Sequence, residues 1–163
     1  MMMTTSGKVA MKGFSFIELL ASVAIMGLLA SVALPLAETT VRRQKENELR
    51  TALRDIRQGI DAYKAASING KIAKRAEESG YPKTLEELVS GVEDASQPGS
   101  KLYFLRRIPR DPFSQDASVS SVDTWRVRSF QSPPDNPRPG DDVFDISSKS
   151  TQHGLNGIPY NEW

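Results

Sequence analysis

Apolar residues are distributed unevenly along this chain, and the longest predominantly apolar stretch runs from Phe14 to Leu36. It has 23 residues and a single charged side chain, Glu18. An α-helix rises about 1.5 Å per residue, so this stretch would form a helix roughly 35 Å long, which is enough to cross a bilayer. We therefore predict a transmembrane or filament-core helix over residues 14–36.

Beyond Leu36 the pattern becomes that of an amphipathic helix, with apolar residues at helical spacing on one face. Asn69-Gly70 is a typical helix stop, so one helix of roughly 55 residues is expected. Its charged face would be solvated or would meet the charges of a neighbouring copy, and the pattern does not separate the two. The apolar face holds Val41, Leu49, Leu53, Ile56, Ile60 and Tyr63; the charged face holds Arg42, Arg43, Lys45, Glu46, Glu48, Arg50, Arg54, Asp55 and Arg57.

The remainder of the chain predicts short elements. Thr84 and Glu87 have the spacing of a capping box, which predicts a short helix over residues 85–89 that ends at Gly91. Apolar and polar residues then partly alternate in segments typical of strands. Strands are expected over residues 125–130 and 143–147, with a further one around 118–122.

Together these elements predict an α+β fold. A long N-terminal α-helix, apolar in its first half and amphipathic in its second, would pack against a small antiparallel β-sheet of three or four strands. The 163 residues suffice for one domain plus an anchor.

Composition excludes several functional classes. The chain has no cysteine, so it has no thiol nucleophile and no thiolate metal site. His153 is its one histidine, and no nucleophile elbow or phosphate-binding loop is present, so we predict that the protein is not an enzyme. The net charge of +1 gives no indication of a nucleic-acid partner.

The residues around the start of the apolar stretch form a specific motif. Lys12-Gly13-Phe14-Ser15-Phe16-Ile17-Glu18 resembles the type III leader junction of the type IV pilin superfamily, which includes type II secretion pseudopilins. In that family, prepilin peptidase cuts after the glycine and methylates the new N-terminal phenylalanine. Glutamate is the fifth mature residue of the family, which Glu18 matches, and proline is common at the position that Pro35 occupies. The chain resembles the major, G-type pseudopilin most.

This resemblance implies a division of the chain into a leader over residues 1–13, the membrane helix over 14–36 and a periplasmic α+β domain over 37–163. Cleavage and N-methylation would involve Gly13 and Phe14, and assembly would involve Phe14, Glu18 and Pro35. The new amino group of Phe14 would pair with Glu18 of a neighbouring subunit, which would neutralise both charges and fix the axial register. The simpler reading places Glu18 at the lipid headgroups without a function.

The resemblance also implies a location and partners. Stored in the inner membrane with its second part in the periplasm, the subunit would polymerise into a helical pseudopilus that drives folded proteins through the outer membrane. Its partners would be other copies, minor pseudopilins, prepilin peptidase, and the inner-membrane assembly platform with its ATPase.

Two further segments match the same family. Residues 81–88 resemble its YP-x-T-x-x-x-L segment, and residues 108–114 resemble its L-P-x-D-P-W-G turn, with Phe113 in place of tryptophan and Ser114 in place of glycine. We interpret the second as a proline turn that an aromatic residue anchors against a small core. Major pseudopilins bind calcium in a C-terminal loop, so Asp135, Asp141, Asp142 and Asp145 are candidate Ca²⁺ ligands, with plain solvation of a proline-rich turn as the alternative.

Three other functions are weighed against a secretion pseudopilin. A type IV pilin or minor pilin shares the motif, although many carry a disulfide that this chain cannot form. A DNA-uptake binding module would be expected to carry more positive charge. A membrane-anchored enzyme would keep residues 1–13 and would tolerate the replacement of Glu18.

Overall fold

In the computed structural model of this protein, the described residues are 13–163, apart from the side chains of residues 32–35. The chain divides into two units, residues 1–41 and 42–163, and each is described by itself. The leader predicted over residues 1–13 lies outside the described residues except for Gly13. The side chain of Pro35, and with it the role predicted for that residue in assembly, lies outside them too.

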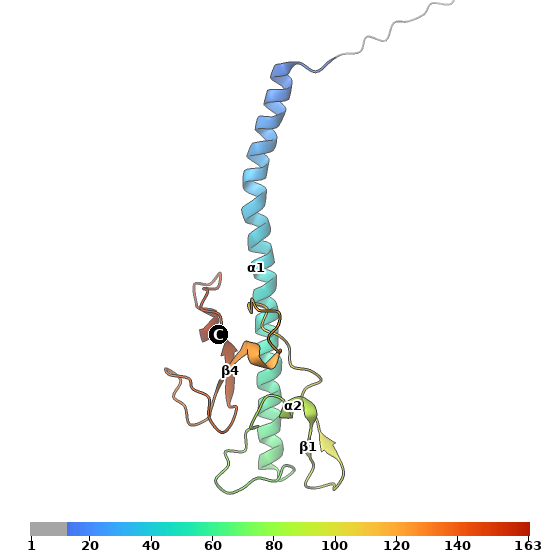
Figure 1. Ribbon diagram of the computed structural model, residues 1–163, viewed down its shortest axis with the longest axis vertical. Coiled ribbons are helices and arrows are strands. Elements are labelled where there is room, and N and C mark those ends of the chain that lie inside the picture. The colour runs from blue at the N-terminus through green and yellow to red at the C-terminus, as the bar shows by residue number, and fades with distance from the viewer. Residues whose placement is uncertain (1–12) are drawn as a thin grey trace, which may run out of the picture. The chain divides into compact units, whose positions relative to one another are not determined.

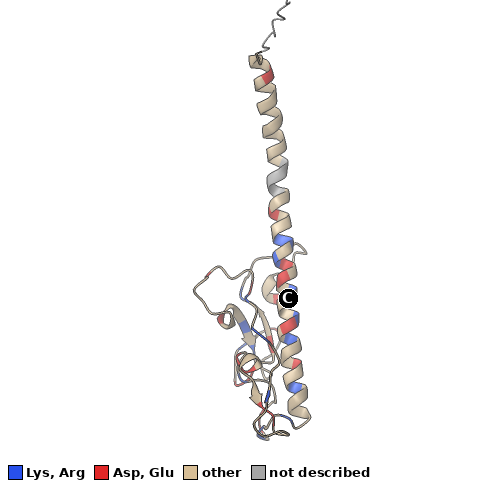
Figure 2. Cartoon of the chain, turned by 90° about the vertical axis from the view of Figure 1, so that its right-hand side faces the viewer, with Lys and Arg blue, Asp and Glu red and all other residues tan. Residues whose placement is uncertain are grey.

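Helix α1 runs from Phe16 to Ile68 and has 53 residues (Figure 1), which confirms the prediction of one long helix. It ends at the predicted stop, because Gly70 has a φ of 72° and Lys71 N–H donates to the carbonyl of Ala66 at 3.0 Å. This is the arrangement of a Schellman cap, which only a residue tolerant of positive φ completes without strain. Figure 2 shows that the first half of α1 is almost free of charge, whereas acidic and basic residues crowd its second half.

The core of the second unit forms along one stripe of α1. Leu49, Leu53, Ile56, Ile60 and Tyr63 are all buried, as the spacing predicts. They pack in one cluster with residues from every later part of the chain, among them Leu85, Leu88, Trp125, Ile146 and Tyr160. The inclusion of Val41 in this stripe is wrong, since its side chain is 56% exposed.

The short helix after α1 is present, but its predicted cap is wrong. Helix α2 spans Glu87–Ser90, its N-cap position is Glu86, and no side chain caps it. The carboxylate of Glu87 instead accepts hydrogen bonds from the hydroxyl of Tyr63 at 3.1 Å and from Lys83 N–H at 3.0 Å. A tertiary contact to α1 and a local bond to Lys83 N–H therefore take the place of the predicted capping box with Thr84. Gly91, with a φ of 80°, ends the helix as predicted.

The α+β class is confirmed, but the single sheet of three or four strands is wrong. Strand β1 (Val92–Glu93) pairs with β2 (Lys101–Leu102), and β3 (Trp125–Arg128) pairs with β4 (Asp145–Ser148), both antiparallel. These are two separate two-stranded sheets in the described part of the chain. The alternating segments at 125–130 and 143–147 therefore pair with each other, within slightly shifted limits.

No strand forms around residues 118–122, contrary to the prediction. A short 3₁₀ helix occupies Val122–Thr124, and a second one occupies Tyr160–Glu162. The hydroxyl of Ser120 donates to the carboxylate of Asp123 at 2.7 Å and accepts from Asp123 N–H at 3.2 Å. Such local side-chain bonds compete with strand pairing, so they favour a turn here.

The turn at residues 108–113 anchors the sheet of β3 and β4, as the reading of an aromatic-anchored proline turn predicts. Asp111 is buried, and its two carboxylate oxygens accept from Phe113 N–H at 2.8 Å and from the Ser148 hydroxyl at 2.6 Å. The ring of Phe113 stacks on Tyr160 at a centroid distance of 3.9 Å. The turn thereby joins β4 to the last segment of the chain.

Candidate functional site

The apolar segment at the start of α1 exposes its side chains on all faces of the helix. Every large apolar residue described from Phe14 to Leu29 is more than half exposed, including Phe16 at 78% and Ile25 at 58%. Among the described residues, this is the part of the chain long and apolar enough to cross a membrane, and none of it is buried within the chain. An apolar surface of this size needs lipid or other protein as its partner.

Glu18 lies in the first turn of α1 within this apolar surface. Its backbone carbonyl accepts a hydrogen bond from the Ser22 hydroxyl at 2.8 Å. No ion pair to Glu18 forms within the described residues, although Gly13 and Phe14 precede it closely and are exposed. The described part of one chain therefore presents one carboxylate among apolar side chains without a compensating cation.

The four aspartates predicted as calcium ligands play different roles. Asp142 is buried and accepts at one oxygen from the Ser129 hydroxyl and from Phe130 N–H, both at 2.8 Å. Asp141 and Asp135 are exposed. Across the described residues, no group of three or more histidine or acidic side chains is gathered closely enough to hold a metal ion. Calcium binding at these residues stays a prediction.

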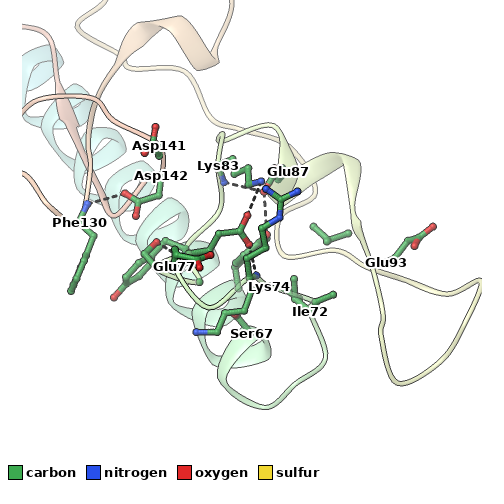
Figure 3. Close-up of a pocket in the computed structure, with 18 of the residues that line it drawn as sticks. Ser67, Ile72, Lys74, Glu77, Lys83, Glu87, Glu93, Phe130, Asp141 and Asp142 are labelled. Atoms are coloured by element: carbon green, nitrogen blue, oxygen red, sulfur yellow. Dashed lines mark hydrogen bonds and ion pairs between the residues drawn. The ribbon is translucent and has the colours of Figure 1, made fainter.

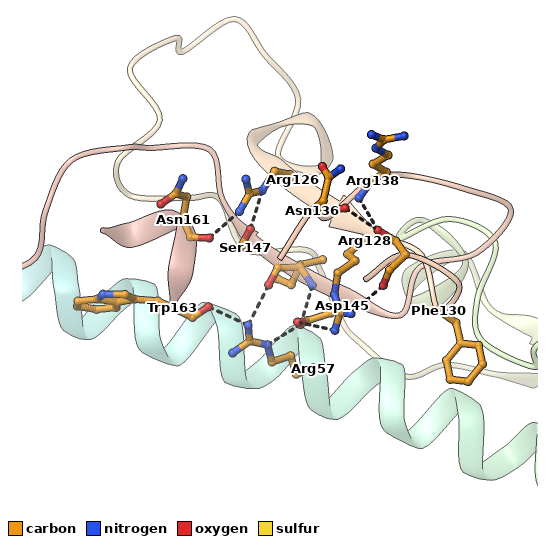
Figure 4. A network of polar contacts seen from close by, with 12 residues as sticks. Arg57, Arg126, Arg128, Phe130, Asn136, Arg138, Asp145, Ser147, Asn161 and Trp163 are labelled. Carbon is orange, nitrogen blue, oxygen red and sulfur yellow. Dashed lines mark hydrogen bonds and ion pairs between the residues drawn. The ribbon is translucent and has the colours of Figure 1, made fainter. Parts of the chain in front are cut away.

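Asp145, the fourth of these aspartates, belongs to an ion-pair network. Figure 4 shows Arg57 of α1 pointing toward Asp145 of β4, and their Nε and Oδ1 atoms are 2.8 Å apart. Arg57 also donates to the carbonyls of Ile146 at 3.0 Å and Trp163 at 2.9 Å. Arg128 lies 3.6 Å from the other oxygen of Asp145. The network fastens β4 and the last residue to the helix.

A second network, which the sequence reasoning missed, fastens the final segment to the start of the second unit. Glu46 is only 4% exposed, and one of its oxygens accepts from the Tyr160 hydroxyl at 2.9 Å and from Leu155 N–H at 2.7 Å. Arg42 donates to the Tyr160 hydroxyl at 3.2 Å and to the carbonyl of His153. Burial raises the pKa of Tyr160, Glu46 adds to that effect and Arg42 opposes it.

A signal for this network was present in the sequence. Arg42 and Glu46 precede Leu49 by seven and three residues, so they continue the buried stripe of α1 toward the N-terminus. Because both side chains are charged, the sequence pattern assigns them to the charged face. In this helix, however, a charged residue at a position that continues the buried stripe makes a polar contact with the final segment.

A surface pocket of about 1270 Å³ lies between the end of α1, the segment after it, and residues 130–142 (Figure 3). Acidic and basic side chains are mixed along its walls. Glu78 pairs with Lys83 at 3.0 Å, and Glu87 accepts from Tyr63. Burial raises the pKa of Tyr63, and the nearby charge of Glu87 raises it further.

The described chain thus combines an exposed apolar helix segment that carries one carboxylate with a second unit closed by polar networks. No known protein family, no curated protein and no solved structure matches this chain.

Proposed function

We propose that this chain is a structural subunit of a helical filament, a pseudopilin of the type II secretion system, that assembles through its apolar helix segment. The observation that carries the proposal is Glu18, the one charge in an apolar surface, placed five residues after Gly13. The motif at the Gly13-Phe14 junction supports cleavage there by prepilin peptidase. The α+β unit that follows α1 is compatible with a pilin-like domain.

Cleavage after Gly13 would supply the missing partner of Glu18. It would create an α-amino cation at Phe14, and a second copy displaced along the helix would place this cation beside the carboxylate. An unpaired carboxylate in hydrocarbon costs a few kcal/mol by insertion scales, so the pairing would favour one axial register over others. The apolar side chains around it would pack against other copies instead of lipid.

Before it assembles, the proposed subunit would be inserted in a membrane. Its apolar segment would span the inner membrane once, with the second unit in the periplasm. Removal of the leader would allow an assembly platform and its ATPase to move subunits into the filament. The growing filament would push folded proteins toward the outer membrane.

The first test of this function is the intact mass and N-terminal residue of the protein extracted from membranes of its native host. We expect a chain that begins at Phe14 and carries one additional methyl group. A chain that still begins at Met1 would overturn the proposal.

The second test replaces Glu18. We expect Glu18→Ala to leave the protein in the membrane and correctly cut, but to reduce filament assembly by at least about tenfold, which corresponds to a loss of 1.4 kcal/mol or more. Glu38→Ala, at an exposed acidic position later in α1, is the matched control and should assemble normally. Retention of folded secreted proteins inside Glu18→Ala cells would separate the secretion role from that of a surface pilus. Normal assembly of Glu18→Ala would contradict the proposal.

A further inference from the structure

A short and largely exposed loop near the end of the chain, residues 153–158, is folded on itself. An isolated antiparallel bridge between His153 and Pro159 closes it, and Gly157 N–H donates to the carbonyl of Gly154 at 2.9 Å. Gly157 has a φ of 80°, a conformation that favours glycine. The loop therefore holds its shape through its own main chain.

Two charged side chains of α1, one helical turn apart, hold this loop. Arg42 donates to the carbonyl of His153, and the carboxylate of Glu46 accepts from Leu155 N–H at 2.7 Å. Both partners in the loop are main-chain groups, so these hydrogen bonds do not depend on the side chains of the loop. We call residues 153–158 the clasp loop.

The part of α1 that the clasp loop holds has no apolar attachment to the rest of the second unit. Residues 42–48 contribute no buried apolar side chain, and the first one along α1, among the described residues, is Leu49. The hydrogen bonds that join residues 42–48 to later parts of the described chain come from Arg42 and Glu46, and they end on the clasp loop and on the Tyr160 hydroxyl. Polar contacts therefore fasten residues 42–48, whereas the apolar core fastens the helix from Leu49 onward.

A polar attachment of this kind is released at a lower cost than an apolar core. Separation of residues 42–48 from the clasp loop would expose Glu46 and main-chain groups of the loop to water, which replaces the lost hydrogen bonds. Separation at Leu49 would instead expose apolar surface, for which water offers no such replacement. Local openings of folded proteins accordingly involve segments with few buried apolar contacts.

We infer that the clasp loop is a conformational device that opens and closes on Arg42 and Glu46 while the core from Leu49 onward stays folded. In the closed state Arg42 is the first residue of the second unit. The open state frees α1 as far as Glu48, which adds about 10 Å of helix to the part that the second unit does not hold. This inference concerns the chain itself and does not rest on the proposed filament.

A pair of spin labels measures the clasp in the full chain, because the protein has no cysteine of its own. Labels at Lys45→Cys and His153→Cys report the distance between α1 and the clasp loop, and both positions are exposed. In detergent-solubilised protein we expect a second, longer distance to become populated at urea concentrations that leave the core folded. The control pair Gln58→Cys with Arg107→Cys, also at exposed positions, should keep one distance until the core unfolds.

The matched variants are two neighbouring arginines. In the background of the clasp labels, Arg42→Ala should raise the population of the longer distance at least about tenfold, because it removes a charged hydrogen-bond donor of the closed state. Arg43→Ala removes an exposed charge beside it and should leave the distances unchanged.

Three outcomes would overturn the inference. The first is a single clasp distance that persists until the core unfolds, in the parent and in Arg42→Ala alike. The second is an Arg42→Ala variant in which the control pair separates together with the clasp pair, because residues 42–48 would then part from the loop only when the core unfolds. The third is an equal effect of Arg43→Ala.

Discussion

The two halves of α1 belong to one continuous helix, yet the first half exposes its apolar side chains and the second half buries them. In the first half, Ile25 and its apolar neighbours are exposed on every face, whereas in the second half Leu49 and Ile56 are completely buried by later parts of the chain. Helix formation is therefore a local property here, and the fate of the apolar surface depends on whether the rest of the chain covers it. The second half finds its partner within the molecule, and the first half needs one outside.

The same contrast holds for the carboxylates. Glu46 is buried and accepts two hydrogen bonds from the final segment, whereas Glu18 lies in an apolar surface with no cation beside it in the described chain. A carboxylate in an apolar environment is stable only when hydrogen-bond donors or a cation lie beside it. The second unit supplies donors for Glu46. The proposed function therefore requires that another subunit supplies a cation for Glu18.

The largest difference between the halves is expected from shortening one isoleucine in each. Ile56→Ala should lower the free energy of unfolding of the second unit by about 2–5 kcal/mol, because it leaves a cavity at a fully buried position. Ile25→Ala should change it by less than about 0.5 kcal/mol, since that side chain contacts no core. The measurement is urea unfolding of the detergent-solubilised protein, followed by the fluorescence of the buried Trp125.

This pair of variants also tests the division between the halves. If Ile25→Ala destabilised the second unit as much as Ile56→Ala, the exposed segment would contribute to the same core. The contrast between a covered half and an uncovered half would then be wrong.

A smaller effect is expected from the buried carboxylate. Glu46→Ala removes the acceptor of the Tyr160 hydroxyl and of Leu155 N–H. The buried hydroxyl left without this acceptor costs about 1–3 kcal/mol, and the loss of the part-buried bond from Leu155 N–H adds about 1 kcal/mol. We expect a loss of about 2–4 kcal/mol by the same urea unfolding. Glu48→Ala is the control, because Glu48 is exposed and accepts a hydrogen bond from Gln44 of the same helix at 3.1 Å. Equal effects of the two variants would show that Glu46 is not a buried partner of the final segment.

The elements that local sequence determines were predictable. The helix of 53 residues, its stop at Asn69-Gly70 and the stripe from Leu49 to Tyr63 all follow from spacing and from the conformational freedom of one glycine. The sequence predicted strands near β3 and β4 but did not show that they pair with each other, because each strand has four residues and the segment between them is irregular. Strands β1 and β2 have two residues each, too few for any alternation to show.

Contacts between distant residues account for most of what the sequence did not reveal. Glu46 and Tyr160 are 114 positions apart, and the hydrogen bond between them depends on how the whole second unit folds. Thr84, three residues before Glu87, predicts a local cap, but Tyr63 of α1 offers Glu87 a donor that the local pattern cannot show. At Asp142, a predicted calcium ligand, one carboxylate oxygen accepts hydrogen bonds from Ser129 and Phe130, which the residue types alone do not show.

The smallest expected effect concerns alkaline pH and Tyr63, which lies in the covered half of α1. Burial and the charge of Glu87 raise the pKa of Tyr63, so the folded state holds this proton more tightly than the unfolded state, in which the pKa is near 10.0. The resulting contribution to stability is fully present below pH 10 and declines as the pH rises above that value. We therefore expect the free energy of unfolding of the parent to fall more steeply above pH 10 than that of Tyr63→Phe. At neutral pH this variant should lose only about 0.5–1.5 kcal/mol, for one hydrogen bond.

Glu87→Gln sharpens this test because it removes the charge and keeps the burial. Its alkaline slope should lie between those of the parent and Tyr63→Phe, since burial is the largest cause of the raised pKa of Tyr63. Urea unfolding at a series of pH values up to and beyond 10 measures all three slopes. If Tyr63→Phe and the parent lost stability in parallel, the hydroxyl would ionise as readily in the folded as in the unfolded protein. Tyr63 would then not lie in a closed contact between α1 and α2, and the covered half of the helix would be open to water at that point.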